Sequence, residues 1–87
     1  MPNIKEKITN ALALPKEVAL DLPIVLATGR GELSIENYKN LIEFTDTAIR
    51  IRTRDGTIAI TGERLILKQI TTESLLIKGR VSGIIYE

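Results

Sequence analysis

The sequence predicts a mainly β protein, in which a short N-terminal helix precedes a meander of short antiparallel strands forming a small sandwich or a partly open barrel. The first observation is a repeat of five-residue segments that begin at positions 33, 41, 49, 57 and 65, and again at 75 and 83. The second is composition, because isoleucine and threonine dominate these segments and their branched side chains suit a pleated strand. Short, evenly spaced segments are typical of all-β folds. Stacked, solenoid-like β coils would give a similar repeat and are the alternative fold.

The first thirteen residues predict an amphipathic helix, and residues 14–87 predict the β domain. Asn3 and Glu6 have the spacing of a capping box, in which a side-chain acceptor precedes an acid by three positions. Apolar residues then recur on one helical face: Ile4, Ile8, Ala11 and Leu12. Pro15 ends this helix, because the residue before a proline avoids the helical region.

In the middle of the predicted meander, the apolar side chains switch from odd-numbered to even-numbered positions. Upstream of it, a strand at 24–26 is closed by a turn at Gly29–Gly31. Residues 49–53 carry apolar side chains at odd positions, whereas residues 57–61 carry them at even positions. Asp55-Gly56 lies between these two segments and supplies turn residues. We therefore expect a bulge or a change of sheet near this dipeptide.

The last three predicted strands carry consecutive apolar residues. They lie at 65–69, 75–79 and 83–87, with turns predicted at 62–64 and 80–82. Runs of this kind are typical of strands that are covered on both faces. The N-terminal helix, a second sheet or another copy of the chain would provide the cover.

The composition argues against an enzyme. The 87 residues make one domain, and their net charge of +1 creates no overall field that attracts nucleic acid or a membrane. Histidine and cysteine are absent, which removes the usual general base and the soft metal ligands. We predict no catalytic, metal-binding or cofactor-binding residue. No apolar run reaches the roughly 18 residues of a membrane span and no signal-peptide pattern is present, so we expect a cytoplasmic protein.

Arg50, Arg52 and Arg54 form a row of positive charge. Alternate residues of a strand share a face, so these side chains would line up about 7 Å apart. Such a row could meet phosphates, an anionic membrane or an acidic partner. It could also be the solvated face of a strand, with Glu43 as a cross-strand partner. The second interpretation is favoured because no cluster of lysines lies nearby.

The remaining candidate sites are better explained as structure. Gly29–Gly31 has too few glycines for a phosphate-binding loop. Asp46 and Asp55 are interpreted as turn residues rather than as paired carboxylates for acid–base work or cation binding. A groove for single-stranded nucleic acid needs aromatic side chains between its basic residues. The only aromatic residues of the chain are Tyr38, Phe44 and Tyr86.

Three passages resemble the YabP/YqfC family of sporulation proteins. They are LPKEVALDLPIV at 14–25, GELSIENYKNLIEFTDTAIRIRT at 31–53 and the stretch 56–87, where GTIAITG precedes a leucine strand, I-x-G and a final apolar strand. The resemblance covers most of the chain and implies a non-enzymatic role in spore development. It also implies a place in the mother cell, peripheral to the outer membrane of the forespore. The partner it implies is YqfD, a membrane-anchored sporulation protein usually encoded beside a member of this family.

Residue chemistry and resemblance together predict a protein–protein interaction or self-assembly module. Strands with apolar side chains on both faces suit a domain that completes its core against a partner or a second copy. Edge strands can also pair with another chain. The predicted interaction surface comprises Arg50, Arg52, Arg54, Leu65, Leu67, Leu75 and Ile77. The alternative function is binding of membrane lipid or nucleic acid through the three arginines.

Overall fold

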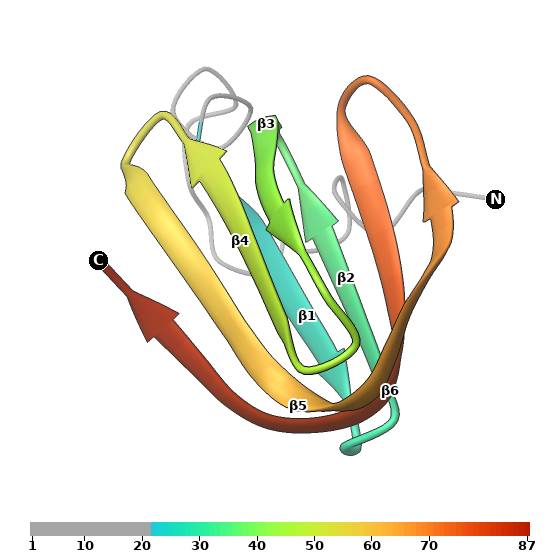
Figure 1. Cartoon of the computed structure of the whole chain (residues 1–87). Helices are drawn as coiled ribbons and strands as arrows, with labels where there is room; N and C mark the ends of the chain where they lie inside the picture. The colour runs from blue at the N-terminus through green and yellow to red at the C-terminus, as the bar shows by residue number, and fades with distance from the viewer. Residues whose placement is uncertain (1–21) are drawn as a thin grey trace, which may run out of the picture.

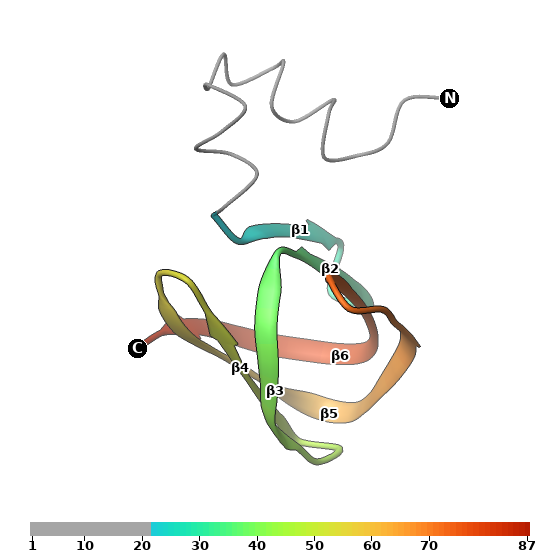
Figure 2. The same ribbon diagram turned by 90° about the horizontal axis from the view of Figure 1, so that it is seen from above.

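The computed structural model describes residues 22–87, and this part of the chain contains strands and no helix (Figures 1 and 2). The strands are β1 (Ile24–Thr28), β2 (Glu32–Glu36), β3 (Tyr38–Phe44), β4 (Ala48–Thr53), β5 (Gly56–Ile70) and β6 (Ser74–Tyr86). The prediction of a mainly β protein is confirmed. The helix predicted for the first thirteen residues lies outside the described residues, as do residues 14–21 of the predicted β domain.

The strands form one open six-stranded sheet in the order β1-β2-β6-β5-β4-β3. From β3 to β6 the chain is a meander, as predicted, because each strand pairs with the next. The β1–β2 hairpin departs from a simple meander, since β2 pairs with β6 and not with β3. Neighbouring strands of the described sheet all run antiparallel, whereas stacked β coils pair in parallel. The solenoid alternative is therefore excluded.

β5 and β6 are long strands of 15 and 13 residues that bend where the sequence predicted turns. Segments 62–64 and 80–82 stay inside these strands, so both predicted turns are wrong. The register between the strands shifts at Thr61/Gly62, Glu63/Ile66 and Leu67/Gln69. Extra unpaired residues of this kind bend a strand and increase its twist. Both strands therefore turn a corner together instead of reversing (Figure 1).

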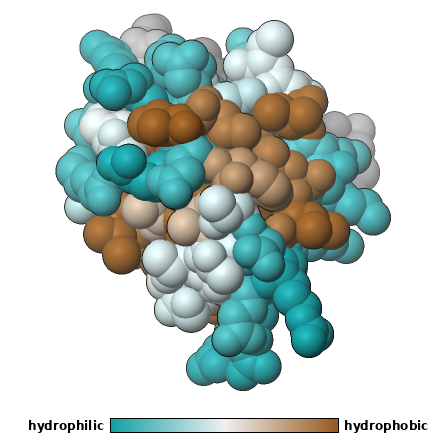
Figure 3. Space-filling view, in the orientation of Figure 1, coloured by the Kyte–Doolittle hydropathy of each residue, from teal (hydrophilic) through white to brown (hydrophobic). Residues whose placement is uncertain are grey.

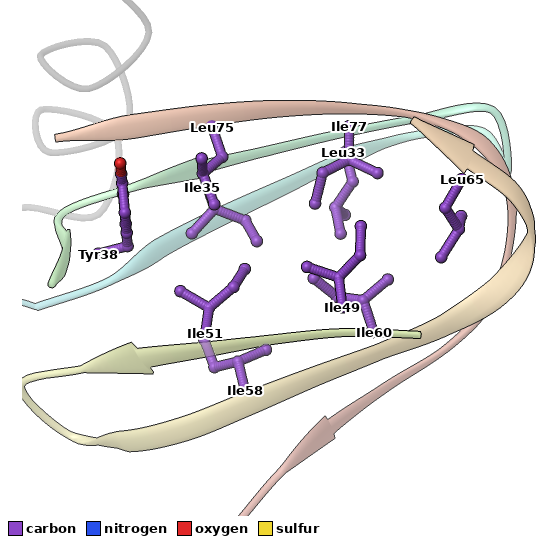
Figure 4. Packing of buried hydrophobic residues seen from close by; sticks show 10 residues of the cluster. All are labelled: Leu33, Ile35, Tyr38, Ile49, Ile51, Ile58, Ile60, Leu65, Leu75 and Ile77. Carbon is purple, nitrogen blue, oxygen red and sulfur yellow. The ribbon is translucent and has the colours of Figure 1, made fainter. Parts of the chain in front are cut away.

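The bend folds the sheet into two halves that face each other. Leaf A consists of β3, β4, residues 56–61 of β5 and residues 81–86 of β6. Leaf B consists of β1, β2, residues 65–70 of β5 and residues 74–78 of β6. Buried branched side chains meet between the leaves (Figure 4): Ile49, Ile51, Ile58 and Ile60 from leaf A, and Leu33, Ile35, Leu75 and Ile77 from leaf B.

The switch of apolar side chains from odd to even positions has a simpler cause than a bulge. β4 and β5 form a hairpin whose turn is Arg54-Asp55. With a two-residue turn, each odd-numbered residue faces an even-numbered one, as Ile51 faces Ile58. Opposite residues share a face of the sheet, so both side chains enter the core. The prediction of a bulge or a change of sheet near Asp55-Gly56 is therefore wrong, since β4 and β5 pair without a register shift in one sheet.

One end of the core is closed where β2 passes into β3. Asn37 makes this link in the left-handed conformation, with φ of 65°, which asparagine tolerates better than most residues. Its backbone N–H donates to the carbonyl of Glu73 at 2.7 Å, and its side-chain amide donates to the carbonyl of Leu22 at 2.8 Å. The ring of Tyr38 follows in the core, and its hydroxyl donates to the carbonyl of Thr71 (Figure 4). The bonds to Glu73 and Thr71 tie the start of β3 to the β5–β6 connection, and the bond to Leu22 ties it to the segment before β1.

Candidate interaction surface

The predicted arginine row is interrupted in the folded chain. Arg50 and Arg52 alternate on the outer face of leaf A, whereas Arg54 lies in the β4–β5 turn. Nη2 of Arg50 donates to Oε1 of Glu87 at 2.8 Å. This hydrogen bond, then attraction to the same carboxylate, raises the pKa of Arg50 above its ordinary value. Glu43, the expected partner, lies opposite Arg50 and adds a weaker attraction, so Arg50 is neutralised by acids of its own chain.

The four apolar residues of the predicted surface face inward. Leu65 and Leu75 are each 1% exposed, and Ile77 is fully buried. Leu67 is partly buried and packs against the same cluster. Because the chain covers these side chains itself, they do not belong to the surface that the described residues present to another molecule.

The exposed large apolar side chains lie elsewhere. They are Ile42 and Phe44 on β3, Ile66 and Ile70 on β5, and Ile85 and Tyr86 on β6. Figure 3 shows apolar residues, in brown, breaking the polar surface in several places. Ile85 and Tyr86 are 51% and 70% exposed, and our sequence reasoning missed both. The sequence signal for exposure was the pair Ile84-Ile85. Two consecutive strand residues point to opposite faces, so only one of the two isoleucines can enter the core.

The folded sheet has edges along β1, β3, residues 65–70 of β5 and residues 82–86 of β6. Edge strands invite pairing with another chain unless charges or bulges protect them. Lys39 and Glu43 lie on β3, where the register also shifts, and Lys68 lies on the β5 edge. β1 and residues 82–86, which we call the β6 edge, carry no charge. Since β1 directly follows residues outside the described part, we take the β6 edge as the candidate surface.

The backbone of the β6 edge directs hydrogen-bonding groups away from the sheet. The N–H of Glu87 donates to the carbonyl of Thr57 at 2.8 Å, and the N–H of Thr57 donates to the carbonyl of Glu87 at 3.4 Å. Such bonded pairs alternate with non-bonded pairs along an antiparallel ladder. The backbone groups of Ile85 therefore face β5, and those of Ile84 and Tyr86 face outward. No strand within residues 22–87 pairs with this outer side.

The other predicted sites do not come together. Gly29–Gly31 forms the expected turn after β1, and carbonyls of this turn accept hydrogen bonds from β6. Asp46 and Asp55 lie beyond opposite ends of β4, so they are not paired carboxylates. Among residues 22–87, no three acidic, histidine or cysteine side chains gather into a metal-binding group. The same part of the chain contains no helix that is long and apolar enough to cross a membrane.

The fold and this surface define a class: a small all-β domain whose single bent sheet encloses its core and, within residues 22–87, leaves edge strands unpaired. Residues 23–87 match the sequence pattern of the YabP family. The chain is also 31% identical over 83 residues to YqfC of Bacillus subtilis (strain 168), described as an uncharacterized protein. That alignment covers 95% of this chain and 89% of the relative. The chain belongs to the YabP family, and the resemblance noted in its sequence is confirmed.

Proposed function

We propose that this chain is a non-enzymatic protein–protein interaction module of sporulation, working in the mother cell at the periphery of the forespore's outer membrane. The observation that carries the proposal is the β6 edge, an uncharged strand with outward backbone groups and the exposed side chains of Ile85 and Tyr86. Membership of the YabP family supports the sporulation setting.

The mode of binding is strand addition. Outward N–H and C=O groups of Ile84 and Tyr86 bond to the backbone of an incoming strand, which gives affinity without a specialised pocket. Specificity comes from side chains on both faces, with Ile85 on the outer face and Ile84 on the inner one. The partner we propose for the resulting assembly is a membrane-anchored protein of the YqfD type.

The arginine face supports anion binding less well. Arg50 is held by Glu87 at 2.8 Å, and Glu43 adds a second negative charge to the same face. An anion-binding function predicts salt-sensitive binding that is lost when Arg50, Arg52 and Arg54 are replaced together by glutamine. The interaction module predicts that partner capture survives this triple replacement.

The test is capture from the mother cell of a sporulating, endospore-forming bacterium. A tagged chain is compared with Ile85→Lys, with Ile66→Lys and with the triple glutamine variant. Ile66 is a matched control because it is 53% exposed, against 51% for Ile85, and lies on leaf B. We expect the YqfD-type protein to co-purify with all of these except Ile85→Lys. Capture that survives Ile85→Lys and fails in the triple glutamine variant would instead support the anionic surface.

A further inference from the structure

The bend of β5 and β6 holds an arginine where the backbone favours glycine. The register shift between Glu63 and Ile66 makes a β-bulge, and Arg64 lies in it with a φ of 54°. When the first residue of a bulge is left-handed, that residue is usually glycine. Other residues held in this conformation cost stability, and they gather at functional sites. The side chain of Arg64 is exposed and bonds to no other side chain among residues 22–87, so the fold itself gives no reason for an arginine here.

Two more arginines reach the bend from other parts of the chain. The carbonyl of Arg30, in the β1–β2 turn, accepts a hydrogen bond at 2.8 Å from the N–H of Val81, which directly follows Arg80. The residue before Arg80 is Gly79, where a Cβ atom would lie 2.5 Å from the carbonyl oxygen of Arg64. The backbones of the three arginines are therefore neighbours at the bend. Arg30 and Arg80 are also exposed, and their guanidinium groups have no ion-pair partner in the described part of the chain.

Positive charge is in excess at this end of the molecule. Exposed Lys68 lies on β5 just beyond the bend. Two acids approach, Glu63 on β5 and Asp46 in the β3–β4 connection, and neither forms an ion pair within residues 22–87. Lys78 and Glu32 pair with each other at 3.9 Å and cancel. Four basic side chains, the three arginines and Lys68, thus face two unpaired carboxylates.

Ile66 adds an exposed apolar side chain beside these charges. It is the first residue of β5 to pair with β6 beyond the bulge, and it is 53% exposed, whereas Leu65 before it is buried. An aliphatic side chain offers no stacking platform to a nucleobase. It can enter the boundary between lipid headgroups and acyl chains, while arginines beside it meet anionic headgroups. This combination favours an anionic lipid surface over nucleic acid.

The shape of the bend also suits a flat surface. Figure 1 shows the bend as the rounded lower end of the molecule, and Figure 3 shows hydrophilic side chains projecting from the same end. A convex end of this kind can rest on a membrane. The β6 edge runs from the bend toward the C-terminus, so it stays accessible to a partner strand at the same time.

We propose that the bend of β5 and β6 binds the anionic headgroups of a lipid membrane through Arg30, Arg64, Arg80 and Ile66, which we call the bend patch. The arginines hold the headgroups, and Ile66 enters the layer beneath them. This inference goes beyond the proposed function, because it concerns a different surface and depends neither on the β6 edge nor on the protein partner.

The first test is flotation of the full chain with vesicles, either of phosphatidylglycerol and phosphatidylcholine in equal parts or of phosphatidylcholine alone. In the bend variant, glutamine replaces the three arginines of the bend patch together. Each arginine near an anionic surface strengthens binding about fivefold, so the bend variant should bind the mixed vesicles roughly 100-fold more weakly than the wild type. The matched control replaces Arg50, Arg52 and Arg54 by glutamine. It loses the same charge and is expected to bind as the wild type does.

The second test uses Arg64→Gly to separate binding from stability. Glycine accepts the left-handed conformation, so the urea midpoint of unfolding should stay the same or rise. Binding to the mixed vesicles should nevertheless fall about fivefold. A structural role for this arginine would instead lower the midpoint and leave vesicle binding unchanged. Ile66→Ser is compared with Ile85→Ser, because the two isoleucines are 53% and 51% exposed, and only the first change is expected to weaken binding.

The outcomes separate this inference from the proposed function. Binding to the mixed vesicles that falls with added salt, and that the bend patch variants weaken while their controls do not, supports the assignment. Absence of vesicle binding, equal loss in both triple variants, or binding of a DNA or RNA oligonucleotide in place of vesicles overturns it. Capture of the YqfD-type protein from a detergent extract, where no bilayer remains, tests the proposed function alone. Capture that survives in the bend variant leaves that function standing, whatever the vesicles show.

Discussion

At the scale of the residue, Arg50 and Glu87 show how a side chain acquires its role from a distant partner. They are separated by 37 positions in sequence and by 2.8 Å in space. The alternation of side chains along β4 identified the face that Arg50 shares with Arg52, because a shared face depends only on the two-residue period of a strand. It did not identify Glu87, because that contact depends on where β6 ends relative to β4.

Leu75 is expected to act as a core residue and not as a contact for a partner. Its side chain is 1% exposed and packs between the leaves, so Leu75→Ala leaves a cavity and should lower the free energy of unfolding by about 2–5 kcal/mol. Urea unfolding followed by circular dichroism measures the change. Ile70→Ala is the control, because Ile70 is 56% exposed and should change stability by roughly 0.5 kcal/mol or less. Equal effects of the two variants would contradict the assignment of Leu75 to the core.

At the scale of the element, β5 and β6 contain turn-forming residues without turning back. Gly62 and the charged residues after it interrupt an apolar run, which is an ordinary turn signal. The two strands nevertheless bend at the same place and keep pairing beyond it. Local composition cannot distinguish a bend from a reversal, because the outcome depends on whether the paired strand bends too. The first four strands were predicted to within a few residues.

The bend is expected to require glycine at position 79. Gly79 has φ of 139°, and a Cβ atom there would lie 2.5 Å from the carbonyl oxygen of Arg64 and 2.8 Å from Cα of Leu65. Gly79→Ala should therefore lower the free energy of unfolding by about 2 kcal/mol or more, measured from the urea midpoint. Gly31→Ala is the matched control, since the nearest atom to its Cβ would be 3.9 Å away. A Gly79→Ala protein as stable as this control would show that the close approach at the bend is not rigid.

At the scale of the whole molecule, the two leaves are expected to unfold together. β5 and β6 run through both leaves, and the buried side chains of each leaf pack against the other. The slowest-exchanging amides of β2, in leaf B, and of β4, in leaf A, should therefore report the same free energy of opening. Native-state hydrogen exchange by NMR measures it directly. A markedly lower value for β2 would show that leaf B opens on its own.

The candidate site was predicted only in part, for a reason that also belongs to this scale. The sequence indicated edge pairing as a mode of interaction and pointed to apolar strands as its support. Leu75 and Ile77 proved to be covered by leaf A, whereas Ile85 proved to be exposed. Which side of an apolar strand is covered depends on how the sheet folds onto itself. That folding is set by the shared bend of β5 and β6, where the repeat predicted turns.

By itself, the sequence determined the strand-rich class of the chain, the faces that alternate side chains share and the absence of histidine and cysteine. These features depend on the strand propensity of each residue, on the two-residue period of a strand and on which residue types the chain contains. All three can be read without knowing which segments pair. Only the tertiary structure decided the strand order, the bends of β5 and β6, the partner of Arg50 and the edge that stays unpaired within residues 22–87. Each of these depends on pairing between distant segments, and that pairing is stabilised only once the whole sheet encloses its core.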